Sequence, residues 1–228
     1  DDKYEYTVSW IDCLSGKNAR GHFMVADHAD DGILKIGDKF KLNFPIQSPV
    51  SLVNKLTLKP FNTLYYNKQR VKEVNVIVGY DPFFYPLDGI LNWNRMYGKK
   101  GFQQYQCVVD YENGYDAIHN ILKAIKSADT SSFLAVLKVF ADVKSPGLLS
   151  FPKRGVTLAL DFPQTKDGNG VLFNRLDSIV AENNGRLYPA KDAHMSAALF
   201  KKSYLNWQQL EKLRDPNIQS RFWQRVTQ

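Results

Sequence analysis

Gly185-Arg186-Leu187-Tyr188-Pro189-Ala190-Lys191-Asp192 is the stretch that marks where the last predicted helix of the sheet region ends and the last predicted strand begins. It follows an amphipathic segment, Val171 to Glu182, and a pair of asparagines of the kind that tolerates the left-handed backbone closing a helix. Pro189 fixes one backbone dihedral and biases Tyr188 toward an extended conformation. We therefore expect a stiff connection that holds Tyr188 and Lys191 in fixed positions.

Upstream of this stretch, strand-like and helix-like patterns alternate regularly. Strands are predicted at 102–111, 133–140 and 156–162, and helices at 115–128 and from about 170 onward. If Leu187 opens the last strand, the order is β-α-β-β-α-β. That order predicts an α+β fold in which helices flank one face of an antiparallel sheet.

The two ends of the chain complete this organisation. Strands are predicted at 4–12 and 22–26, a turn at 15–18, a loop at 27–47, a short helix at 51–58, a strand at 74–78 and a helix at 89–97. The tail, 196–226, is predicted to be helical with a break at Asp215-Pro216.

Successive strand side chains point to opposite faces, so polar residues can be assigned to faces. Lys138 shares its face with Leu134, Val136 and Phe140, and an unpaired buried ammonium is costly, so we expect a partner such as Asp161. If the strand faces coincide, they form a polar pocket suited to a sugar, with Leu134 and Phe140 as apolar walls. Its polar lining would be Gln104, Gln106, Lys138, Thr157 and Asp161. The alternative is a half-buried structural ion pair between Lys138 and Asp161, with the glutamines facing water.

Composition limits the function classes. The chain has 228 residues, of which 44% are hydrophobic, so it can bury a core and is not predicted to be disordered. Its formal charge of +7 favours anionic partners, yet the basic residues are scattered and are not interleaved with aromatic residues in a nucleic-acid motif. We therefore expect no nucleic-acid partner.

Cys13 and Cys107 have no metal-ligand spacing and are predicted to be free thiols in a reducing compartment. No apolar run reaches the roughly 18 residues of a spanning helix, which predicts a soluble protein. The segment Asp27 to Asp38 is similar to a calcium loop, but Ala29 and Asp38 stand where such loops prefer other ligands, so no metal is expected. The chain lacks an initial Met and enters a strand pattern at once, which favours a fragment whose upstream part is missing.

An ordered set of motifs resembles one enzyme family over nearly the whole chain. Besides Gly185 to Asp192, the set comprises Tyr4 to Asp12, Asp27 to Ala29, Pro86 to Asp88, Trp93 to Arg95, Gln104 to Gln106, Ser150 to Pro152 and Leu160 to Pro163. Together they resemble the decaprenylphosphoryl-β-D-ribose 2-oxidase-like FAD-linked oxidoreductases of the vanillyl-alcohol oxidase and D-arabinono-1,4-lactone oxidase superfamily. Thr157 and Ala159 depart from the Asn and Cys usual in that family, which leaves the sugar specificity open.

The resemblance implies a division of the chain and a set of site residues. Residues 1–187 would be the substrate-binding cap domain, and 188–228 the closing segment of an FAD-binding domain whose N-terminal half is absent. Tyr188 and Lys191 would reach the active site and contact the flavin. The substrate side would be lined by Gln104, Gln106, Leu134, Lys138, Phe140, Thr157, Ala159 and Asp161, with Arg95 in support.

The implied reaction is the FAD-dependent oxidation of a secondary hydroxyl on a polyprenyl-phosphate-linked pentose. Its 2-keto product would pass to an NAD(P)H-dependent keto-sugar reductase, completing a ribose-to-arabinose epimerisation for cell-wall arabinan. Lys191 would either stabilise charge on the reduced flavin or act as a base. The fragment alone is expected to be inactive and not to hold FAD, and the protein to be cytoplasmic, with peripheral contact at the inner membrane face left open. The alternatives are a sugar-1,4-lactone oxidase and a non-catalytic anion-binding module.

Overall fold

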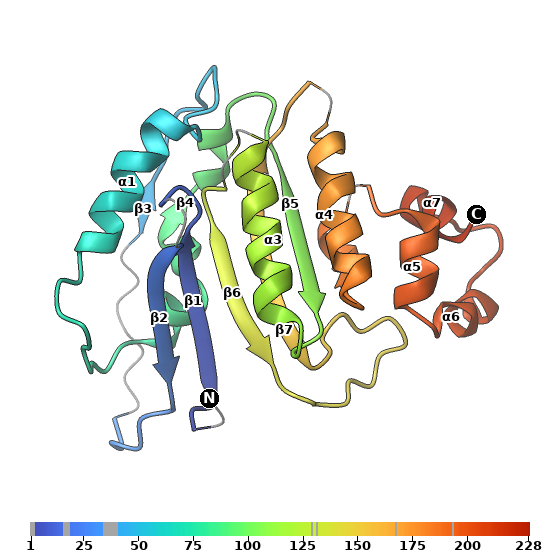
Figure 1. Ribbon diagram of the computed structural model, residues 1–228, viewed down its shortest axis with the longest axis horizontal. Coiled ribbons are helices and arrows are strands. Elements are labelled where there is room, and N and C mark those ends of the chain that lie inside the picture. The colour runs from blue at the N-terminus through green and yellow to red at the C-terminus, as the bar shows by residue number, and fades with distance from the viewer. Residues whose placement is uncertain are drawn as a thin grey trace.

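A six-stranded antiparallel sheet organises the chain. The computed structural model describes residues 3–15, 19–33, 41–128, 130, 132–166, 168–192 and 194–228. The strands lie in the order β2-β1-β6-β7-β5-β8, and every neighbouring pair is antiparallel (Figure 1). Their bounds are β1 (Tyr6–Asp12), β2 (Arg20–Ala26), β5 (Phe102–Val109), β6 (Ala135–Phe140), β7 (Gly155–Pro163) and β8 (Arg186–Leu187). The predicted antiparallel sheet is confirmed.

Two amphipathic helices cover one face of this sheet. The helices α3 (Gly114–Ser127) and α4 (Gly170–Glu182) cross in front of the strands in Figure 1. Their apolar stripes pack on strand residues of one parity, so that Tyr105, Cys107 and Leu158 are buried against Ile121 and Leu176 in one core. Side chains of the other parity face away from α3 and α4, and that face carries the polar residues. The predicted α+β class is confirmed.

The opposite face is covered at its β1-β2 end by α1 (Lys55–Asn67). Trp10 packs edge-on against Tyr65 with ring centroids 4.7 Å apart, and Asn62 Nδ2 donates to Asp12 Oδ1 at 2.7 Å. The predicted helix at 51–58 was placed too early and too short. The helix begins at residue 55 because the Asn54 side chain caps it in a capping box, and it continues through Pro60.

Two predictions between α1 and β5 were wrong. The β-branched run 74–78 forms no strand in the described chain, and Val76 and Ile77 are exposed, because β propensity without a partner edge does not make a strand. The predicted helix at 89–97 is interrupted at Asn92, whose φ is +58°. In this region lie α2 (Tyr80–Phe84), the 3₁₀ turns η1 (Pro86–Gly89) and η2 (Trp93–Tyr97), and β4 (Ile90–Leu91) paired with β3 (Leu42–Asn43).

The C-terminal tail is helical, as predicted. It contains α5 (Ala197–Ser203), α6 (Trp207–Leu213) and α7 (Arg221–Thr227), and Asp215-Pro216 lies in the break between the last two. Phe200, Trp223 and Val226 are buried in the same core cluster as the sheet. The tail therefore packs on the sheet-bearing part, while the domain boundary at 187/188 stays a prediction.

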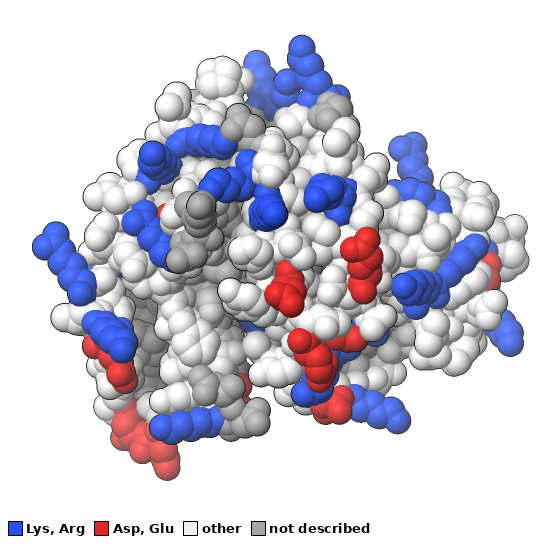
Figure 2. Space-filling view, viewed as in Figure 1, with Lys and Arg blue, Asp and Glu red and all other residues white. Residues whose placement is uncertain are grey.

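On the helix-bearing face, Lys and Arg side chains stand singly or in small groups, with acidic side chains among them (Figure 2). None of the described helices combines the length and hydrophobicity needed to span a bilayer. Cys13 and Cys107 are both free thiols. Residues 16–18 of the predicted turn, and Asp38 of the calcium-like segment, lie outside the described residues.

Candidate functional site

The strand register brings the predicted polar residues to one face of the sheet. Residues directly opposite each other in neighbouring strands share a face. Gln104 lies opposite Asp161, and Lys138 lies opposite Thr157. Gln106 and Ala159 are opposite each other between these two pairs. Phe140 has the parity of Lys138, so seven of the eight predicted lining residues occupy the face away from α3 and α4, and Leu134 lies just before β6.

The 3₁₀ turn η3 (Pro189–Lys191) brings Lys191 to the same face. The backbone of Tyr188 is extended, with φ −82° and ψ 113°, and its N–H donates to the Gln106 carbonyl at 2.9 Å. This confirms the extended conformation expected for the residue before Pro189. Lys191 Nζ donates to Gln104 Oε1 at 2.7 Å, and Gln104 Nε2 donates to Asp161 Oδ1 at 2.9 Å. The three side chains form a hydrogen-bonded row, which we name the Lys191-Gln104-Asp161 row.

Two buried polar atoms beside this row have no partner. Asp161 is 2% exposed and Tyr97 is 1% exposed, and both Asp161 Oδ2 and the Tyr97 hydroxyl lack a hydrogen bond. Burial raises the pKa of Asp161 to about 6, although the Gln104 hydrogen bond and the Lys191 charge act in the opposite direction. Burial and the Asp161 charge raise the pKa of Tyr97. Such unpartnered groups fit a site that hydrogen-bonds a ligand.

Tyr97 was missed by the sequence reasoning. It lies two residues after Arg95, at the end of η2, and stacks on Phe102 with ring centroids 4.4 Å apart. Because Tyr97 belongs to no regular strand or long helix, no periodic pattern assigned it to a face. Its only signal was its place just after the motif Trp93 to Arg95.

Asp161→Asn is expected to stabilise the fold at neutral pH. The folded pKa of Asp161 is raised above its unfolded value, so its contribution to stability is present at low pH and is lost as pH rises through about 6. The variant should therefore unfold with a free energy higher by about 1 to 3 kcal/mol at pH 8, and with no difference below pH 4. Urea unfolding across that range measures the effect.

Asp110→Asn is the matched control for that experiment, and it should give the opposite sign. Although burial opposes the effect, hydrogen bonds from Lys153 and Asn184 lower the pKa of Asp110 overall. The Asp110 variant should lose stability at neutral pH and approach the original protein as pH falls. If the free energy of unfolding of the Asp161→Asn protein equalled that of the original protein at every pH, the raised pKa of Asp161 would be contradicted.

Lys138 lies toward the other end of the polar face, and the expected ion pair with Asp161 is not formed. Asp161 is four residues along β7 from Thr157, the residue opposite Lys138, which is roughly 13 Å of strand. Lys138 instead borders a small cavity of about 160 Å³ together with Tyr6 and Phe84. The half-buried structural pair is therefore excluded as the reason for this lysine.

Aromatic side chains join the predicted apolar wall to the η3 turn. Phe151 meets Phe140 edge-on at 6.0 Å and stacks on Tyr188 at 4.7 Å between ring centroids. Phe151 was also missed, although the motif Ser150 to Pro152 contains it. A row of three rings, Phe140, Phe151 and Tyr188, thus lies along one side of the polar face.

The Arg95 guanidinium is bound to the backbone of the segment that follows β3. Its Nη1 donates to the backbone carbonyls of Phe44, at 3.3 Å, and Pro45, at 2.6 Å. Because Arg95 belongs to η2, these bonds hold the turn that ends at Tyr97. The supporting role predicted for Arg95 stays a prediction. Within the described ranges, no three His, Cys, Asp or Glu residues gather as metal ligands.

Comparison with known proteins gives relatives for nearly all of the chain. No family model matches. The chain is 34% identical to decaprenylphosphoryl-beta-D-ribose oxidase of Mycolicibacterium smegmatis over 94% of its own length. It is 26% identical over 90% of its length to a Streptomyces coelicolor protein described as an uncharacterized protein in mprA 5'region. The chain spans 49% and 59% of the length of these two relatives. The similarity to decaprenylphosphoryl-β-D-ribose oxidase that the ordered motifs indicate is thereby confirmed over nearly the whole of this chain.

Proposed function

We propose that this chain is the substrate-binding part of an FAD-dependent oxidoreductase that oxidises a secondary hydroxyl of a polyprenyl-phosphate-linked pentose to a keto group. The observation that carries the proposal is the Lys191-Gln104-Asp161 row beside the unpartnered Tyr97 hydroxyl and Asp161 Oδ2. A sugar ring offers several hydroxyls that both donate and accept, which suits these groups. The similarity to a decaprenylphosphoryl-ribose oxidase supports the same class of substrate.

The chain's own residues would bind and orient the sugar. Asp161 Oδ2 would offer an acceptor and the Tyr97 hydroxyl a donor, since neither atom has a hydrogen-bond partner within the described residues. Gln106 would help to fix the ring, since its Nε2 reaches Thr157 Oγ1 at a long 3.4 Å and can turn toward a ligand. The rings of Phe151 and Tyr188 supply an apolar surface for the carbon face of the sugar.

In this proposal the flavin would lie at the Lys191 end of this face. Lys191 is half-buried, and its ammonium donates a hydrogen bond to Gln104. Its backbone belongs to the η3 turn, so the positive charge has a defined position. FAD, when bound, would accept the hydride from the sugar carbon. Lys191 would then either stabilise negative charge that develops beside it or take the hydroxyl proton. Tyr188 would contact the flavin beside Lys191.

The remaining expectations belong to this proposal. Residues 188–228 would close an FAD-binding domain, the keto product would pass to an NAD(P)H-dependent reductase, and the protein would act in the cytoplasm or at the inner membrane face. A sugar-1,4-lactone oxidase is the near alternative. Anaerobic mixing of the full-length protein with a short-chain prenylphosphoryl ribose, or with a sugar-1,4-lactone, distinguishes the two activities by which compound bleaches the flavin. Flavin bleaching by the lactone alone would overturn the phosphate-linked substrate.

Lys138→Met is expected to weaken binding of the prenylphosphoryl ribose at least about tenfold, because a charge-assisted hydrogen bond to an anionic ligand is lost. Lys138 is half-buried and its ammonium forms no ion pair with the described residues, so removing it leaves no carboxylate unpaired. Isothermal titration of the full protein measures the change. Lys123→Met, an exposed lysine of α3 on the other face, is the matched control. Equal affinity in both variants would remove Lys138 from the site.

A further inference from the structure

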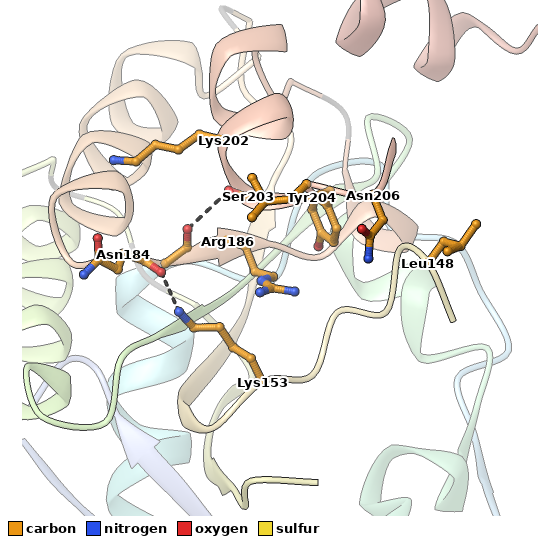
Figure 3. Close-up of a pocket in the computed structure, with 10 residues that line it drawn as sticks. Leu148, Lys153, Asn184, Arg186, Lys202, Ser203, Tyr204 and Asn206 are labelled. Atoms are coloured by element: carbon orange, nitrogen blue, oxygen red, sulfur yellow. Dashed lines mark hydrogen bonds between the residues drawn. The ribbon is translucent and has the colours of Figure 1, made fainter. Parts of the chain in front are cut away.

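A second cavity lies at the β8 edge of the sheet, apart from the proposed sugar site. Its volume is about 350 Å³, at the lower end of the roughly 300–1,000 Å³ typical of small-molecule sites. The loop before β7, the strand β8, the end of α5 and the segment that follows it line this half-open cavity (Figure 3). Its polar lining comes from Lys153, Asn184, Arg186, Lys202, Ser203, Tyr204 and Asn206. None of these residues belongs to the Lys191-Gln104-Asp161 row.

Arg186 is the central cation of this cavity. In Figure 3 its side chain reaches into the space between Lys153 on one side and Tyr204 and Asn206 on the other. Nη1 donates to the Ser150 carbonyl at 3.1 Å, and the guanidinium lies over the Tyr204 ring at 5.3 Å. These contacts hold one edge of the guanidinium and leave further N–H donors for the cavity, since a guanidinium carries five.

Arg186 is half-buried and has no carboxylate partner. Among the described residues its guanidinium forms no ion pair, and its contacts are the Ser150 carbonyl and the Tyr204 ring. The nearby carboxylate of Asp110 is bound by Lys153, which also donates to the Asn184 carbonyl at 2.6 Å. Lys153 and Arg186 therefore have one nearby carboxylate between them, and Lys202 adds a third cation to the lining, so the cavity carries an excess of positive charge. An anion in the cavity would offset the cost of burying Arg186.

We propose that this cavity binds the phosphate group of a small soluble phosphorylated molecule, with Arg186 as its main ligand. A planar guanidinium matches two phosphate oxygens at once, and Lys153 and the Asn206 amide stand on the same lining. The volume exceeds that of the phosphate and leaves room for an organic group of about pentose size. This site does not rest on the proposed oxidoreductase function.

Calorimetric titration of the full chain with ribose 5-phosphate, at constant ionic strength, tests the site. We expect saturable binding that Arg186→Gln weakens at least about tenfold, since charge-assisted hydrogen bonds are lost. Inorganic phosphate should bind with the same dependence on Arg186, and ribose should not bind. Arg154→Gln, which changes an exposed arginine paired with Glu112, is the control and should leave the affinity unchanged.

Asn206→Asp is a second variant. Because Asn206 is exposed, this substitution leaves Arg186 and the core intact. The carboxylate that the substitution introduces should repel phosphate and lower the affinity for ribose 5-phosphate several-fold, while the circular dichroism spectrum stays unchanged. Binding of ribose 5-phosphate that is absent, or unaffected by both variants, would overturn the proposal. Arg186-dependent binding to phosphatidic acid vesicles without binding of ribose 5-phosphate would overturn the soluble ligand.

Discussion

Lys191→Met is expected to slow substrate-driven reduction of the flavin by about 100-fold in the protein as encoded in full, the loss typical when one preorganised electrostatic group is removed from a reacting centre. The lysine is fixed by the η3 turn and by its 2.7 Å bond to Gln104, so no neighbouring cation of the row can replace it. Stopped-flow absorbance under anaerobic conditions, with a prenylphosphoryl ribose as substrate, measures the rate.

Lys191→Arg separates the two roles that the geometry allows for this residue. Arginine keeps the charge but does not give up its proton in proteins, so it should restore much of the rate if Lys191 acts electrostatically and none if it acts as a base. Lys212→Met, an exposed lysine of α6, is the control for loss of charge alone. Undiminished flavin reduction in the Met variant would remove Lys191 from the mechanism and leave the sheet face as a binding surface only.

The polar face could be predicted from sequence because strand parity is a local property. Once residues 102–111, 133–140 and 156–162 were recognised as strands, the faces of Gln104, Lys138 and Asp161 followed from the two-residue period alone. The register between strands was not available, since it depends on pairing that is non-local. That is why Lys138 and Asp161 were expected to pair, although the register puts Thr157 opposite Lys138 and Gln104 opposite Asp161.

Residues on irregular segments could not be assigned in the same way. Tyr97 and Phe151 reach the polar face from a 3₁₀ turn and a loop, where no period relates side-chain direction to sequence position. The run 74–78 shows the converse error, because its β-branched residues matched a strand pattern but the fold offers it no partner edge. Tertiary contacts, here the absence of a partner strand, therefore override the local β propensity of this run.

Phe200→Ala is expected to lower the free energy of unfolding by about 3 to 5 kcal/mol, a large part of the roughly 5 to 15 kcal/mol of a typical domain. The ring is fully buried and packs against Tyr204, Phe222 and Trp223, with centroids 5.2 to 5.9 Å away. Because Phe200 shares one core with β5 and α4, the loss should appear as a single transition in urea unfolding.

Hydrogen exchange followed by mass spectrometry distinguishes a shared core from an independent tail. In the Phe200→Ala protein, peptides from α3 and from α7 should lose protection together, since both elements contribute to the same cluster. Leu205→Ala, at a side chain that is 79% exposed, should change stability by less than about 0.5 kcal/mol. Loss of protection confined to α5, α6 and α7 would show that the tail folds as a separate unit, and Lys191 would then lie at a hinge rather than on a fixed support.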